Sequence, residues 1–78
     1  MVIVYLYGSA RAAAKKDLLY FEPSSVATIL DQCAQLNSKL AQIMPQCGVL
    51  LNGAACHDFE QMLTSGNQLD ILPKFAGG

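Results

Sequence analysis

The sequence predicts one α+β domain, and three observations support this prediction. Short runs of aliphatic, aromatic and β-branched residues end at glycine or proline, which is typical of strands. One longer segment repeats apolar residues every three or four positions, which is typical of a helix packed on a core. The chain has 78 residues, of which 53% are hydrophobic, and this size suits one core rather than two.

The N-terminal third predicts two strands joined by a short connection. Residues 2–7 are β-branched, aromatic or aliphatic, so we expect a central strand that is covered on both faces and ends at Gly8-Ser9. Residues 10–16 are rich in alanine and favour a helical turn or a short connection. Residues 18–22 predict a second strand, which Pro23 ends.

The main helix is predicted to begin after Ser24-Ser25, which offers an N-cap hydroxyl. Its apolar face is expected to comprise Val26, Ile29, Leu30, Cys33, Leu36 and, after a break, Leu40. The break is expected at Asn37-Ser38, where a second short helical turn begins. Pro45 and Gly48 end that turn, and Met44 within it is expected to fill a gap in the core.

A hairpin is predicted after this second turn. Residues 49–51 are aliphatic and favour a third strand. The dipeptide Asn52-Gly53 follows them, and both central positions of a tight primed turn need positive φ, which asparagine and glycine tolerate. We therefore expect a short fourth strand directly after the turn.

The last strand is predicted at residues 69–72, after a turn at 65–67, and Pro73 is expected to end it. Residues 58–63 before that turn have no clear periodicity. Met62 among them is expected to fill a gap in the core.

The order of elements is therefore strand, strand, helix, strand, short strand, strand. Rules of chain connection favour a first hairpin that crosses over through the helix, with the first and last strands parallel in the centre of the sheet. This arrangement is the β-grasp fold: a mixed sheet of about five strands packed on one main helix. We expect one such domain over residues 1–78, with an extended, flexible tail at residues 73–78.

The charge balance excludes one class of partner. Five Lys and Arg residues are offset by six Asp and Glu residues, and the formal net charge is −1. The basic residues form no cluster beyond Lys15-Lys16. Because nucleic-acid binding depends on clustered positive charge, we expect neither DNA nor RNA as a partner.

No membrane span or export signal is predicted. The longest nearly uncharged stretch, residues 41–55, contains Pro45, Gly48 and Asn52-Gly53 and is shorter than the roughly 20 apolar residues that a span needs. The N-terminus carries no basic residue before its apolar run. We expect a cytoplasmic protein.

The cysteines predict neither a disulfide framework nor a metal site. Cys33, Cys47 and Cys56 are three in number and have no C-x-x-C spacing. We interpret them as reduced thiols. An alternative is a reactive Cys56 activated by His57, but neighbours along a strand point to opposite faces.

The C-terminal tail carries the chemistry that the sequence suggests. Six residues from Pro73 onward follow the last strand and can extend over about 20 Å. Gly77-Gly78 has no side chains, so it can enter a narrow channel and present its α-carboxylate to another protein's active site. The carboxylate would then be a substrate, and the chain needs no catalytic group or phosphate-binding loop of its own. We therefore predict that the protein is not an enzyme and binds no cofactor.

At this point the chain resembles the MoaD/ThiS family of ubiquitin-like sulfur carriers over essentially its whole length. The resemblance rests on four segments: Tyr5-Leu6-Tyr7-Gly8-Ser9-Ala10-Arg11, Pro23-Ser24-Ser25-Val26-Ala27-Thr28-Ile29-Leu30, Val49-Leu50-Leu51-Asn52-Gly53, and Gly66-Asn67-Gln68-Leu69-Asp70-Ile71-Leu72-Pro73-Lys74-Phe75-Ala76-Gly77-Gly78. The proline after the last strand and the single alanine before Gly-Gly look more like the MoaD branch, the small subunit of molybdopterin synthase.

The resemblance implies a function for the last two glycines. Gly78, preceded by Gly77, would be adenylated by a separate ubiquitin-activating-type enzyme similar to MoeB or ThiF, which uses ATP. The adenylate would be converted to a thiocarboxylate that donates sulfur. In the MoaD branch the tail would insert into a large subunit similar to MoaE, in molybdenum cofactor biosynthesis.

Five further residues are candidates for contact with partners. Phe75 and Ala76 lie beside the glycines, and an exposed aromatic side chain there would contact whatever receives the tail. Tyr7 could extend the same patch. Lys74 and Arg11 could pair with acidic groups of an activating enzyme, although solvated surface charge explains them equally simply.

Three alternatives stay open. The sulfur could serve thiazole (thiamine) or cysteine biosynthesis. The chain could be a ubiquitin-like modifier that forms isopeptide bonds through Gly78. It could also be a β-grasp interaction module with an inert tail.

Overall fold

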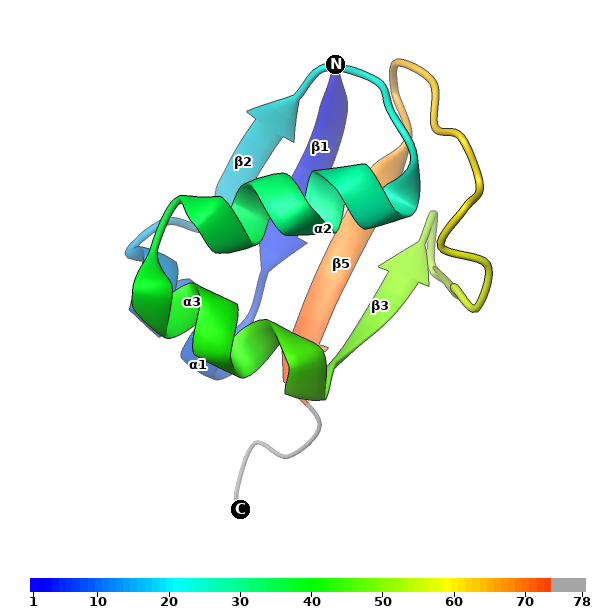
Figure 1. Ribbon diagram of the computed structural model, residues 1–78. Coiled ribbons are helices and arrows are strands. Elements are labelled where there is room, and N and C mark those ends of the chain that lie inside the picture. The colour runs from blue at the N-terminus through cyan, green and yellow to red at the C-terminus, as the bar shows by residue number, and fades with distance from the viewer. Residues whose placement is uncertain (74–78) are drawn as a thin grey trace.

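Strands and helices alternate along the computed structural model, which describes residues 1–73 (Figure 1). The first half contains β1 (Val2–Leu6), α1 (Gly8–Ala14), β2 (Leu18–Phe21) and α2 (Val26–Gln35). The second half contains α3 (Ser38–Ile43), the 3-10 turn η1 (Met44–Gln46), β3 (Cys47–Leu51), β4 (Ala54–Ala55) and β5 (Gln68–Pro73). Five strands and a main helix α2 were predicted, and both are found.

The strands form one mixed sheet in the order β2-β1-β5-β3-β4. β5 lies in the centre, parallel to β1 and antiparallel to β3. Val4 pairs with Leu69 in the parallel ladder, and Val49 pairs with Ile71 in the antiparallel one. The predicted β-grasp order, with the first and last strands parallel in the centre, is confirmed.

The core lies between one face of this sheet and the helices. Figure 1 shows α2 crossing that face, while α1 and α3 lie at the end of the sheet where β5 finishes. The buried apolar side chains come from all these elements: Val2, Val4, Leu6, Ala10, Leu19, Val26, Ile29, Cys33, Leu40, Leu63, Leu69 and Ile71.

The other face of the sheet corrects an expectation for β1. Burial alternates along β1: Val2, Val4 and Leu6 are buried, whereas Ile3 and Tyr5 are only half-buried. The prediction that β1 is covered on both faces was wrong, because the helices pack on one face only. We call the other side the open face; from the strand register it comprises Ile3, Tyr5, Leu18, Tyr20, Leu50, Gln68, Asp70 and Leu72.

Helix boundaries follow side-chain caps. The Ser25 hydroxyl accepts a hydrogen bond from the Thr28 N–H at 3.1 Å, which begins α2 as predicted. The Asn37 Oδ1 accepts from the Lys39 and Leu40 N–H groups at 2.8 and 3.1 Å, which begins α3. The expected break at Asn37 is confirmed.

Three local expectations needed revision. The alanine-rich connection is a helix of seven residues that begins at Gly8, two residues earlier than expected. Leu36 is 61% exposed because α2 ends at Gln35 and the chain turns out of the buried stripe. Met62 is 67% exposed, since it lies in a loop that pairs with Ser25 rather than entering the core.

The hairpin after β3 has the predicted geometry. Asn52 and Gly53 have φ of 50° and 87°, so both central residues of the turn lie in the left-handed region. Leu51 pairs with Ala54 directly across the turn. The Asn52 side chain also accepts a hydrogen bond from the Gln68 N–H at 2.9 Å, which ties the hairpin to the beginning of β5.

Candidate functional site

The structure fixes the point at which the chain leads into the predicted tail. β5 is hydrogen-bonded on both sides, and it continues to Pro73, which pairs with Cys47 of β3. Pro73 was expected to end the strand and instead forms its last residue. Because β5 is the central strand and Ile71 is fully buried, the segment that leads to Lys74 is firmly held.

The junction between β1 and α1 packs beside Pro73. Gly8 has φ of +54°, and a Cβ added to it would lie 3.4 Å from Cγ of Pro73. The left-handed backbone favours glycine here, whereas the added Cβ would make only an ordinary van der Waals contact with Pro73. The resemblance had included Gly8 only as part of a sequence segment, and the structure gives a physical reason for it.

Tyr7 connects this junction to the open face. Its N–H donates to the carbonyl oxygen of Ile71 at 3.2 Å, and its hydroxyl donates to Oδ1 of Asp70 at 3.3 Å. Partial desolvation, followed by the nearby Asp70 carboxylate, raises the pKa of the Tyr7 phenol above its ordinary value. Tyr7 therefore contacts the last strand through both its backbone and its side chain, and its expected contact with a partner stays a prediction.

Asp70 was not singled out from the sequence. It is only 8% exposed although it lies on the open face, and its Oδ1 also accepts a hydrogen bond from Nε2 of Gln68 at 3.0 Å. The alternation of side chains along β5 could have revealed it, because the acidic residue stands between the buried Leu69 and Ile71.

Arg11 lies on α1, one turn after Tyr7. Its Nε is 3.8 Å from Oδ1 of Asp17, and both side chains are largely exposed. An exposed pair at this distance contributes little to stability. Tyr7 and Arg11 are close along the backbone, but their side chains contact different acidic residues, Asp70 and Asp17.

The other predicted site residues lie outside the residues that the structure describes. They are Lys74, Phe75, Ala76, Gly77 and Gly78. The roles expected for them remain predictions.

The cysteine thiols are free within the described part of the chain. Burial raises the pKa of the Cys33 thiol to about 12 and also raises the pKa of the Cys47 thiol. Cys56 lies just after β4, and its thiol contacts the carbonyl oxygen of Asp58 at 3.7 Å.

Residues 1–73 contain no cluster of three His, Cys, Asp or Glu side chains able to hold a metal ion. None of the helices in this range is long and apolar enough to cross a bilayer.

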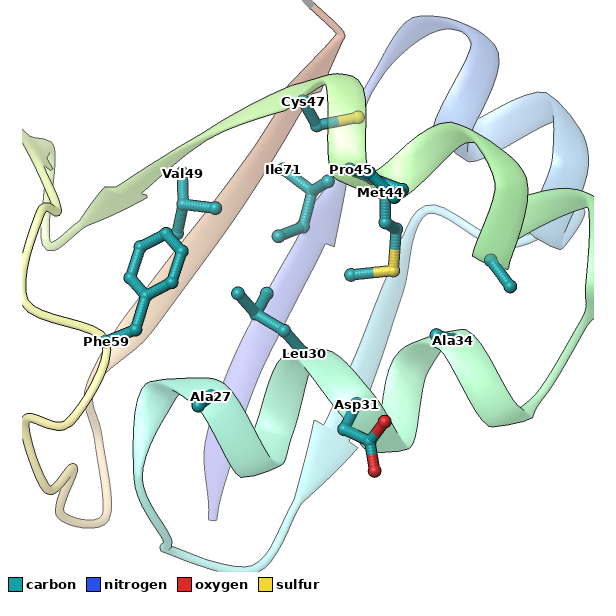
Figure 2. Close-up of a pocket in the computed structure, with 11 residues that line it drawn as sticks. Ala27, Leu30, Asp31, Ala34, Met44, Pro45, Cys47, Val49, Phe59 and Ile71 are labelled. Atoms are coloured by element: carbon teal, nitrogen blue, oxygen red, sulfur yellow. The ribbon is translucent and has the colours of Figure 1, made fainter.

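A groove of about 360 Å³ opens on the helical side of the molecule. Figure 2 shows Leu30 and Met44 pointing toward Ile71, with Phe59 and Val49 at one end. The sequence had placed Met44 in the core, and it is a half-buried wall of this groove. Phe59 is 42% exposed and comes from the segment without clear periodicity, so no pattern pointed to it.

Comparison by sequence finds no similar protein. The chain matches no protein-family model, and no curated protein is similar enough in sequence to match.

Comparison by structure finds several. Small archaeal modifier protein 1 from Methanosarcina acetivorans has a TM-score of 0.86 and 21% identity, with 99% of this chain and 95% of that chain covered. A chain of the BexX/CysO complex from Amycolatopsis orientalis has a TM-score of 0.79 and 19% identity, with 100% of both chains covered. A chain of the complex of subunits 1 and 2 of the molybdopterin-converting factor from Helicobacter pylori has a TM-score of 0.74 and 19% identity, with 99% and 97% covered.

At these identities the likeness establishes the fold. The chain has the β-grasp, ubiquitin-like fold over its described length. The structural neighbours agree with the resemblance to the MoaD/ThiS family that the sequence motifs suggested.

Proposed function

We propose that the protein is a ubiquitin-like sulfur carrier, in which the α-carboxylate of Gly78 is the reacting group. The observation that carries the proposal is the place of Gly77-Gly78 in the sequence, a few residues after the central strand of this fold. Gly78 is the fifth residue after Pro73, which ends the central strand. Five residues span at most about 17 Å, enough to reach into a partner's active site beyond the end of the sheet.

The names of the structural neighbours support the proposal of a ubiquitin-like sulfur carrier. They include a small archaeal modifier protein, subunit 1 or 2 of a molybdopterin-converting factor and a chain of the BexX/CysO complex. Two of the three were solved in complex with a second protein. These neighbours are consistent with a small domain that acts by binding other proteins. Such a domain would itself be a protein substrate rather than an enzyme.

The chemistry would proceed in two displacements on partner enzymes. An oxygen of the Gly78 carboxylate attacks the α-phosphorus of ATP, and pyrophosphate leaves to give an acyl adenylate. A sulfide-level sulfur nucleophile then attacks the carbonyl carbon and displaces AMP, leaving a thiocarboxylate. The first partner would be an activating enzyme of the MoeB/ThiF type, and the chain would bind no cofactor of its own.

For the sulfur acceptor, we propose the role of molybdopterin synthase small subunit, with a MoaE-like large subunit as the second partner. The proline after the last strand and the single alanine before Gly-Gly favour this branch. The Helicobacter pylori complex of the two converting-factor subunits is a structural precedent for the pairing.

A second candidate is a protein modifier, because the modifier from Methanosarcina acetivorans has a TM-score of 0.86. In that case the nucleophile that displaces AMP from the acyl adenylate would be the amine of a target lysine, rather than the sulfur nucleophile. Proteolysis of partner proteins would then leave Gly-Gly remnants on lysines, and their detection by mass spectrometry would favour this function.

Intact mass spectrometry tests the proposal. The full chain is incubated with ATP, a sulfide donor and the activating enzyme of its own source. We expect the mass to rise by the difference between sulfur and oxygen, and a variant lacking Gly78 to show no rise. A full-length chain that never exchanges oxygen for sulfur with any such enzyme would refute the proposal.

A further inference from the structure

We propose that the open face docks on the activating enzyme through an arginine of that enzyme, which pairs with the Asp70 carboxylate beside Tyr5 and Tyr7. This inference rests on the proposed function, since it takes the activating enzyme as the partner. Every variant of that function, carrier or modifier, requires such an enzyme.

The Asp70 carboxylate is poorly solvated before any partner binds. It is 8% exposed in the centre of the sheet, with Tyr5 and Leu50 opposite it in the two neighbouring strands. Apart from Gln68 and Asp70, the open face as defined consists of aliphatic and tyrosine side chains. A partner that covered this face would remove the remaining water from a negative charge.

The charge has no counter-ion within residues 1–73. The ion pair in this range joins Arg11 to Asp17, and no Lys or Arg nitrogen of the described residues lies within 4.0 Å of Asp70. Desolvating an uncompensated carboxylate is costly, so a purely apolar partner surface would be disfavoured. A partner cation removes this cost and gives the contact its specificity.

The carboxylate is also arranged to accept one more ligand. Both of its hydrogen bonds, from Tyr7 and from Gln68, end on Oδ1. No hydrogen bond from the described residues reaches Oδ2, and that atom is not among the fully buried polar atoms without a partner, so it is not completely shielded from solvent. A donor from outside can therefore approach Oδ2 while the two internal donors hold the carboxylate in place.

The surroundings favour arginine over lysine. Tyr5 is the register partner of Asp70, and Tyr7 reaches it through its hydroxyl. A planar guanidinium can stack on such rings while it donates to a carboxylate, and it is more weakly hydrated than an ammonium group. The same face continues to Leu72, next to the residue where the chain leads into the tail, so docking here would direct Gly78 toward the enzyme.

Binding and turnover of the full chain with its own activating enzyme test the inference. We expect Asp70→Asn to raise the Kd, measured by titration calorimetry, by about tenfold or more. In a pyrophosphate-release assay the KM should rise while kcat stays unchanged. The matched control is Asp31→Asn on the exposed surface of α2, which removes the same charge from the other side and should leave both constants within about twofold.

Three further measurements test the inference if Asp70→Asn folds poorly. Higher salt should weaken binding of the unmodified chain, and Tyr5→Leu should raise its Kd by about threefold. An enzyme arginine whose substitution by glutamine removes the effect of Asp70→Asn would identify the partner residue. Equal Kd values for the unmodified chain, Asp70→Asn and Tyr5→Leu would overturn the inference. Failure of the proposed function is distinct: the unmodified chain would then gain no sulfur.

Discussion

The two faces of the sheet differ in how deeply their apolar side chains are buried. On the helix-covered face, Val4, Leu69 and Ile71 are fully buried against α2 and its neighbours. On the open face, Tyr5, Leu50 and Leu72 are half-buried although they alternate with core residues along the same strands. Neighbouring residues of one strand thus have different environments, and only one of the two sets is covered by the rest of the domain.

This difference separates stability from recognition. Apolar area on the helical side is already removed from water and contributes to folding. Apolar area on the open face is still available, so it can contribute to binding when a partner covers it. A β-grasp domain of this size can therefore keep its core unchanged while its open face meets a larger protein.

The largest expected effect comes from truncating one residue on each face and comparing the loss in the free energy of unfolding. Ile71→Ala creates a cavity in the core and should lower the free energy of unfolding by about 2–5 kcal/mol. Leu72→Ala, the next residue on the open face, should cost about 1 kcal/mol because the side chain is only half-buried. Urea unfolding of both variants measures the two losses. Equal losses would mean that the open face stabilises the fold as much as the core does.

The next largest loss in the free energy of unfolding is expected for a substitution at Gly8, in the junction between β1 and α1. Gly8→Ala forces a residue with a Cβ into the left-handed region, and it should cost about 1–2 kcal/mol. Gly53→Ala is the matched control, since φ is +87° there but nothing lies within 4 Å of an added Cβ. Because the Cβ at Gly8 would make only an ordinary van der Waals contact with Pro73, thermal or urea unfolding should show similar losses for the two variants. A clearly larger loss for Gly8→Ala would show that the space beside Pro73 is limiting.

Removing the cap of α3 should have a smaller effect on the helical side. Asn37→Ala loses the hydrogen bonds to two backbone N–H groups and the bond from Nδ2 to the carbonyl oxygen of Ala13, 3.1 Å long. The free energy of unfolding should fall by about 1 kcal/mol. Asn37→Asp retains the acceptor and loses only the donor to Ala13, so its stability in urea should lie between those of the other two. An Asn37→Asp chain as unstable as Asn37→Ala would assign the effect to Ala13 instead of the cap.

The smallest effect should be the pH response of Tyr7 on the open face. Its folded pKa is raised above 10.0, so the folded chain favours the neutral phenol. The resulting stabilisation is present in full below the unfolded pKa and is lost as the pH rises through the folded pKa. Asp70→Asn should lower the Tyr7 pKa part of the way, because desolvation remains.

Ultraviolet titration of tyrosinate, with Tyr7→Phe subtracted to remove Tyr5 and Tyr20, measures this pKa. An unchanged Tyr7 pKa in Asp70→Asn would show that the carboxylate does not act on the phenol.

Much of the fold could be predicted because local and long-range signals agree. Ser25 and Asn37 are polar caps placed just before apolar helical stripes, and Asn52-Gly53 is a turn that few other dipeptides make well. The first and last strands are both apolar, which predicted their central, parallel pairing. The caps and the turn depend on neighbours in the chain, and the strand pairing follows from the apolar character of two whole segments, so the sequence pattern reveals both.

The misjudged residues depend on tertiary contacts. Leu36 fits the helical stripe, but the stripe ends one residue earlier because the chain turns toward the Asn37 cap. Met62 is apolar and exposed, and no periodicity around it could show this. Covering one face of β1 and not the other is a property of the whole sheet, so the apolar run in β1 could not reveal it.

The sequence pointed to Tyr7 and the tail as parts of the candidate site but not to Asp70. Tyr7 was a candidate for partner contact and is found hydrogen-bonded to the last strand, whereas the tail residues 74–78 lie outside the described range. Asp70 was overlooked because a single acidic residue in an apolar strand carries no motif. The register places it between Tyr5 and Leu50 on an uncovered face, and the Tyr7 hydroxyl donates to it.

The parallel pairing of β1 with β5 also separates the two ends of the described chain. Met1 lies beside the beginning of β5, where its amino group donates to Oγ of Ser65 at 2.6 Å. Pro73 lies at the opposite end of that strand, about 20 Å away for six residues. A polypeptide fused ahead of Met1 would therefore emerge on the side of the domain remote from Pro73.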